Sequence, residues 1–181
     1  MPRKLLTALA LLATTSLTSC WSPFHDLTSG HALEPRGPAF ARALHAGYVE
    51  LSETRNWAFD LSDGEHFNLK AKAAAEGLPI KPDKPGSRDL PESEAAVLAE
   101  AHGRLWQSFR KGARNLVPRR AATAQFHYDC WLEAAAGSRW SDARDCSLAF
   151  EIAMAEVQLA MVAPPRGGVS APPGQKLRIK L

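Results

Sequence analysis

Valine and isoleucine are scarce in this sequence, while alanine is abundant along most of its length. β-Branched residues favour strands, whereas alanine is the strongest helix former. The scarcity argues against a β-sheet protein, and we expect an all-α domain. No internal repeat is found.

Long apolar runs are also lacking after residue 20, so no later segment offers a membrane span of about 20 apolar residues. One short run, Leu5–Leu12, follows Arg3 and Lys4 and precedes a hydroxyl-rich stretch. This three-part layout is typical of an export signal. We therefore expect residues 1–19 to be a signal peptide.

Cysteine is rare, with three residues in the chain. The first closes the stretch Leu17-Thr18-Ser19-Cys20, which resembles the lipobox of bacterial lipoproteins and implies lipidation of Cys20. Two or three acyl chains anchor a protein stably, since each buried methylene contributes about 0.8 kcal/mol. Trp21, rather than Asp, follows this cysteine and favours the periplasmic face of the outer membrane. The alternative is an ordinary signal peptide, cut at a pair of small residues.

The remaining residues suffice for one domain. We assign residues 20–37 to a Pro/Gly-rich tether, 38–162 to the helical domain, and 163–181 to a Pro/Gly-rich basic tail. Two of the 22 bases lie in the signal and four in the tail, so residues 20–162 carry 16 bases against 19 acids, a net charge of −3. We expect no nucleic-acid binding. The tail is either solvated or in contact with anionic lipid or polysaccharide.

Apolar stripes at spacings of three and four residues predict a small bundle of four or five helices. A capping-box match at Ser62-Asp63-Gly64-Glu65 predicts the start of the second helix, and Gly77 its end. The third stripe runs on to Ala113. The alternating segment Lys176–Leu181 could form a strand fragment without a partner. The expected helices span 38–58, 62–77, 91–113, 118–136 and 141–162.

Cys130 and Cys146 lie 16 residues apart, on either side of a turn at Gly137-Ser138. In an antiparallel helical hairpin they would lie about 10 Å and about 7 Å from the turn, at similar heights. This placement suits a disulfide, which needs Cα atoms about 5.5 to 6 Å apart. The alternative, prompted by His127, makes Cys130 a metal ligand or nucleophile. A closed zinc site needs four ligands, however, and no second paired motif exists.

Four tryptophans, at positions 57, 106, 131 and 140, fit either core and hairpin packing or ligand stacking, and packing is the simpler interpretation. Asp60, Asp63 and Glu65 suggest calcium, but EF-hand spacing is absent and helix capping accounts for them. We therefore predict no metal site and no cofactor.

The run Ala121–Glu133, followed by Trp140 and Cys146, resembles the N-terminal helical region of OmpA-family outer-membrane lipoproteins of alphaproteobacteria. Weaker matches are Asn56-Trp57, Leu90-Pro91 and Gly112-Ala113-Arg114. The resemblance implies an envelope location, lipid anchoring and a helical build. Family members usually continue into a peptidoglycan-binding OmpA-like domain, and the sequence contains no match to it. No peptidoglycan-binding residue is carried over.

These features predict a lipid-anchored envelope lipoprotein that acts as a structural or interaction module, without catalytic machinery. Its expected partners are the membrane, through the anchor, and other envelope proteins or peptidoglycan. One alternative is a periplasmic ligand-binding or hydrolytic protein with a pocket in the bundle. Another is a truncated copy of a longer lipoprotein.

Overall fold

A computed structural model describes residues 30–162, and the predicted signal, Cys20 and the tail lie outside this range. The predicted all-α class is confirmed for the described part, which contains helices and no strand. No helix between residues 30 and 162 is both long and apolar enough to cross a membrane. The elements are α1 (Ala39–Trp57), α2 (Leu61–Ala75), a 3-10 turn (Pro85–Ser87), α3 (Glu92–Arg110), α4 (Ala113–Leu116), α5 (Pro118–Ala136) and α6 (Trp140–Val162).

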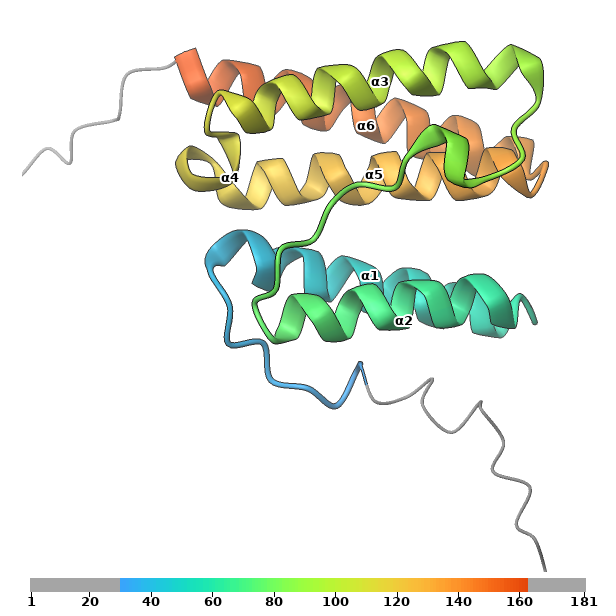
Figure 1. The fold of residues 1–181 in the computed structure, drawn as a ribbon, viewed down its shortest axis with the longest axis horizontal. Helices are drawn as coiled ribbons and strands as arrows, with labels where there is room; N and C mark the ends of the chain where they lie inside the picture. The colour runs from blue at the N-terminus through green and yellow to red at the C-terminus, as the bar shows by residue number, and fades with distance from the viewer. Residues whose placement is uncertain (1–29, 163–181) are drawn as a thin grey trace, which may run out of the picture.

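The helices form two groups that meet at α5 (Figure 1). Helices α1 and α2 make an antiparallel hairpin on one side, while α3, α5 and α6 lie on the other. A long connection, residues 78–91, runs from one group to the other. Helix α5 contacts α1, α3, α4 and α6, so it is covered on most of its sides.

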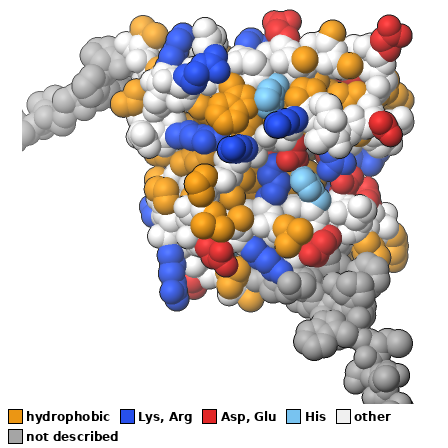
Figure 2. Space-filling view, in the orientation of Figure 1, with side chains coloured by type: hydrophobic (Ala, Val, Ile, Leu, Met, Phe, Trp, Pro, Cys, Tyr) orange, Lys and Arg blue, Asp and Glu red, His pale blue; other side chains and the backbone are white. Residues whose placement is uncertain are grey.

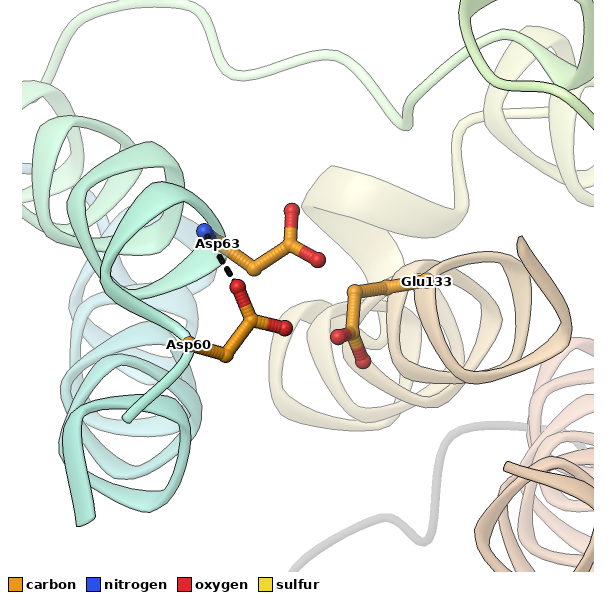
Figure 3. A group of neighbouring side chains, drawn as sticks. All are labelled: Asp60, Asp63 and Glu133. Carbon is orange, nitrogen blue, oxygen red and sulfur yellow. Dashed lines mark hydrogen bonds between the residues drawn. The ribbon is translucent and has the colours of Figure 1, made fainter. Parts of the chain in front are cut away.

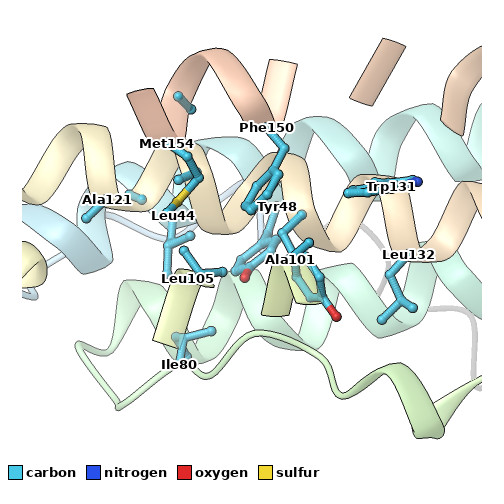
Figure 4. Packing of buried hydrophobic residues seen from close by; sticks show 14 of the residues in the cluster. Leu44, Tyr48, Ile80, Ala101, Leu105, Ala121, Trp131, Leu132, Phe150 and Met154 are labelled. Atoms are coloured by element: carbon cyan, nitrogen blue, oxygen red, sulfur yellow. The ribbon is translucent and has the colours of Figure 1, made fainter. Parts of the chain in front are cut away.

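The core combines large side chains from several helices, including Trp131 and Leu132 of α5, with small alanine side chains on α5 (Figure 4). Leu44 and Tyr48 of α1, Leu105 of α3 and Phe150 of α6 are fully buried. Small side chains let helix backbones approach closely, which explains why alanine is so frequent in this chain. The buried alanines of α5 are Ala121, Ala122, Ala124, Ala134 and Ala135.

The expected capping box is wrong. Helix α2 begins at Leu61, and its N-cap is Asp60, whose carboxylate accepts a hydrogen bond from the Asp63 amide at 3.3 Å. A short acidic side chain in this position satisfies one of the free N–H groups of the first turn, so Ser62 is not needed as a cap. Gly77, with φ +76°, lies just beyond the helix end, as predicted.

The third predicted helix is too long. Helix α3 ends at Arg110, and Gly112 adopts φ +91°, a conformation that favours glycine. The helix therefore stops before Ala113. Ala113 instead begins the one-turn helix α4, and its side chain is still fully buried. The apolar spacing therefore identified a core residue correctly but placed it on the wrong element.

The tryptophans divide into two pairs, so the packing prediction is only half correct. Trp131 is buried and Trp106 partly buried. Trp57 and Trp140 are 84% and 53% exposed, because each lies at an end of a helix beyond the packed region.

Residues 30–37, within the expected tether, lie against α1 and α2. The Gly30 amide donates to Asn68 Oδ1 at 3.1 Å, and its carbonyl accepts from His45 Nε2 at 2.9 Å. The Arg36 amide donates to the Ala75 carbonyl at 2.9 Å. These bonds fix the chain on the helical hairpin before α1 begins.

Candidate functional site

The predicted disulfide is present. Cys130 of α5 and Cys146 of α6 are bonded, with their Cα atoms 5.8 Å apart. Because both thiols are in the bond, Cys130 offers neither a thiolate nucleophile nor a metal ligand in this state. His127 lies one turn earlier on α5 and is half-buried, and burial lowers its pKa.

A buried polar network is centred on Asp129, the residue before Cys130. Its carboxylate is fully buried and accepts from three elements. Tyr48 Oη of α1 donates to it at 2.6 Å, Lys70 Nζ of α2 at 2.7 Å and the Asp83 amide of the long connection at 2.8 Å. Asp129 therefore joins α5 to α1, α2 and residues 78–91 in a single cluster.

Lys70 is shared between two carboxylates, since it also donates to Asp83 at 2.9 Å. His66 Nε2 lies 2.8 Å from the other oxygen of Asp83. Burial acts to raise the pKa of Asp83, but His66 and Lys70 outweigh it and hold that pKa at about 2. The pKa of Asp129 is raised, because its complete burial and the nearby Asp83 charge outweigh Lys70. The two carboxyl groups around one ammonium therefore differ in proton affinity.

The network continues through Gln125 to a half-buried guanidinium. Gln125 Nε2 donates to Tyr48 Oη at 2.8 Å, and Arg114 donates to Gln125 Oε1 at 3.3 Å and to the Ile80 carbonyl at 3.0 Å. The Arg114 guanidinium also lies 4.0 Å from the ring centroid of Phe109, a cation–π contact. Burial lowers the pKa of Arg114.

Three carboxylates, two at the start of α2 and one on α5, form a second cluster (Figure 3). Ligand atoms of Asp60, Asp63 and Glu133 lie within 4.8 Å of one another, and Glu133 points toward the two aspartates. Glu133 is 1% exposed, and burial raises its pKa to about 7 although Arg55 and Arg139 act to lower it. The spacing of these ligand atoms is compatible with a bound cation. The residues differ from those that the sequence suggested, because Glu133 takes the place of Glu65.

Guanidinium groups already neutralise this carboxylate cluster. Arg139 hydrogen-bonds to Glu133 and lies 3.7 Å from Asp60, while Arg55 lies 3.8 Å from Glu133. A third guanidinium, Arg88, lies 2.7 Å from Asp63. Each of the three acids thus has a guanidinium within 4 Å, and the arrangement is that of an ion-pair network.

Sequence reasoning missed both clusters, although α5 carries a signal for them. Gln125, Asp129 and Glu133 recur at intervals of four, so they share one face of the helix. All three are at most 1% exposed, among buried alanines. A polar stripe flanked by alanines on a central helix therefore marks the face that binds the α1–α2 hairpin.

Three grooves of the described region lie away from the Asp129 network, and one of them shares Arg55 with the carboxylate cluster. The largest has a volume of about 460 Å³ and is lined by parts of α1, α5 and α6 beside the disulfide. Two others, of about 220 Å³ each, lie between α3 and α6 and around Trp131 and Trp140. The Asp129 network lines none of the three, so its groups bond mainly to one another. Its clearest role is to hold the two helix groups together.

The surface in the view of Figure 2 carries basic and acidic side chains interspersed with hydrophobic ones.

Comparison with known proteins gives no family model, no curated protein and no solved structure that matches this chain. The resemblance to OmpA-family lipoproteins therefore stays a prediction.

Proposed function

We propose that this chain is a lipid-anchored lipoprotein of the bacterial outer membrane, and that its helical domain acts as a structural or interaction module in the periplasm. The proposal rests on the basic and apolar N-terminus and on the lipobox-like residues that end at Cys20. Its expected partners are other envelope proteins or peptidoglycan.

The cysteine pairing is the observation that carries the proposal. Cys130 and Cys146 form a disulfide, and such bonds are typical of oxidising compartments such as the periplasm. Of the three cysteines in the chain, only Cys20 is then left without an intramolecular partner. Lipidation of Cys20 would account for it, so export and anchoring explain the whole cysteine set.

The interaction role is supported by an apolar stripe on the outer face of α6. Leu148, Ile152, Leu159 and Val162 are 62%, 55%, 73% and 85% exposed. Their spacing of three, four or seven residues puts them on one side of the helix, while Phe150 faces the core. Contiguous exposed apolar surface is typical of sites where proteins meet.

Cell fractionation tests the anchor directly. In a Gram-negative host, we expect the natural chain to sediment with membranes and to be released by detergent. The Cys20→Ser variant should appear in the soluble periplasmic fraction. The matched control is Cys130→Ser with Cys146→Ser, which keeps Cys20 and should stay with the membranes. A natural chain in the soluble fraction, or Cys20→Ser in the membrane fraction, would contradict the proposal.

A further inference from the structure

The groove beside the disulfide has an apolar wall formed by three helices. Leu51 of α1, Phe126 of α5 and Ala149 of α6 line it, together with the Cys130–Cys146 disulfide. Phe126 packs directly against the backbone of α1, where Gly47 leaves room for its ring. The disulfide and this ring give the groove a rigid wall that can bury aliphatic side chains.

Carboxylates give the same groove a negative character. Glu50, Asp142 and Asp145 line it, and Glu50 and Asp145 are exposed. Within residues 30–162, Arg55 is the one guanidinium that lines the groove; it is 7% exposed and lies 3.8 Å from Glu133 and 3.6 Å from Asp142. The positive charge of Arg55 is therefore largely offset, and two exposed acids remain beside the apolar wall.

Among the described residues, the only other titratable side chain that lines the groove is His127. Burial lowers its pKa, so the ring is neutral at pH 7. An apolar surface next to uncompensated carboxylates is complementary to a ligand that alternates basic and aliphatic side chains. The chemistry thus selects a cationic, apolar peptide segment.

We propose that this groove binds the segment Lys176–Leu181 of the same chain. In its sequence, Lys-Leu-Arg-Ile-Lys-Leu, three basic residues alternate with three aliphatic ones. The segment lies outside the described residues, so the proposal rests on its sequence and on the groove. The bases would pair with Glu50 and Asp145, and the aliphatic side chains would contact Leu51 and Phe126.

The length of the intervening chain permits this contact. Helix α6 ends at Val162, and Ala149 lies 13 residues earlier, about 20 Å back along the helix. Residues 163–175 span up to about 45 Å when extended. The segment can therefore reach the groove of its own molecule. The inference does not depend on the lipid anchor, so either can fail without the other.

Photo-crosslinking of the full chain tests the contact. A benzoylphenylalanine at position 179 replaces Ile179, and the products of irradiation are mapped by mass spectrometry. We expect cross-links to the peptides that contain Leu51, Phe126 or Ala149, within one molecule and in a yield independent of protein concentration.

Two double variants separate charge from fold. Glu50→Gln with Asp145→Asn should lower the yield about fivefold or more, because two ion pairs are lost. Glu92→Gln with Glu100→Gln changes two exposed acids of α3 and should leave the yield unchanged. Circular dichroism checks that both variants stay folded.

Three results would overturn the proposal. One is cross-links scattered over the surface without preference for the groove. Another is groove products that join two molecules and increase with concentration, which would assign the groove to the segment of a second copy. The third is an equal loss of yield in both double variants, which would remove the charge argument.

Discussion

Helix α6 and the α1–α2 hairpin are held to the central helix α5 by different chemistry. Helix α6 is bonded covalently to α5 by Cys130–Cys146, and the ring centroids of Trp131 of α5 and Phe150 of α6 lie 6.1 Å apart. The α1–α2 hairpin meets α5 through apolar contacts, such as Phe126 against Gly47, and through the fully buried Asp129 and Glu133 with their partners. A disulfide is insensitive to protonation, whereas a buried ionic contact responds to any loss of a partner or charge. The α1–α2 attachment should therefore be the more sensitive to mutation and to pH.

The largest expected effect comes from breaking the ionic contact at its centre. Asp129→Ala leaves the ammonium of Lys70 and the hydroxyl of Tyr48 without their shared acceptor. Removal of one partner from a buried pair typically destabilises by about 3 to 5 kcal/mol. Urea unfolding should show this loss in the free energy of unfolding. The control, Asp89→Asn, changes an exposed carboxylate and should alter stability by no more than about 0.5 kcal/mol. Equal effects of the two variants would refute the assignment.

Breaking the covalent contact should have the next largest effect. Reduction of Cys130–Cys146, which closes a loop across 16 residues, should lower the free energy of unfolding by about 3 kcal/mol. Parallel urea titrations with and without a reductant measure the difference. The double variant Cys130→Ser with Cys146→Ser should not respond to the reductant. A natural chain that is equally stable in both titrations would show that the disulfide contributes nothing.

Protonation of Glu133 should make the contact between α5 and the α1–α2 hairpin depend on pH, unlike the disulfide between α5 and α6. Burial raises its pKa in the folded state to about 7, above the usual 4.5. A folded state that holds its proton more tightly is favoured at low pH, so this contribution is complete below about pH 4.5 and is lost as pH rises to about 7. The slope for one proton is at most about 1.4 kcal/mol per pH unit. Glu133→Gln should flatten the pH dependence of stability in this window. An unchanged profile would show that Glu133 is ionised throughout.

The smallest effect should come from a surface ion pair between α3 and α6. Arg104 donates to Glu151 at 2.8 Å, but both side chains are at least one-third exposed. Exposed pairs contribute about 0 to 1 kcal/mol, so Glu151→Gln should lower the free energy of unfolding by no more than that. Thermal unfolding monitored at low and at high salt checks the prediction. A loss as large as that of Asp129→Ala would show that burial does not determine the order of effects.

The sequence predicted the helical architecture well because apolar spacing and alanine content report directly on helix packing. The hairpin of α5 and α6 and its disulfide followed from two cysteines and an intervening turn. The buried polar network could not be predicted in the same way. Nothing in the sequence distinguishes His66, Lys70 and Asp83 from ordinary surface residues. Only tertiary packing brings them near Asp129. The N-cap of α2 was misplaced by two residues because Asp60 and Ser62 are both capable caps.

The anchor and the disulfide can be tested together by intact-protein mass spectrometry on the membrane fraction of the native host, alkylated with and without prior reduction. The account predicts a chain that begins at Cys20, carries acyl chains, and takes up two alkyl groups only after reduction. A soluble chain with free thiols at Cys130 and Cys146 would contradict both the envelope assignment and the covalent attachment of α6.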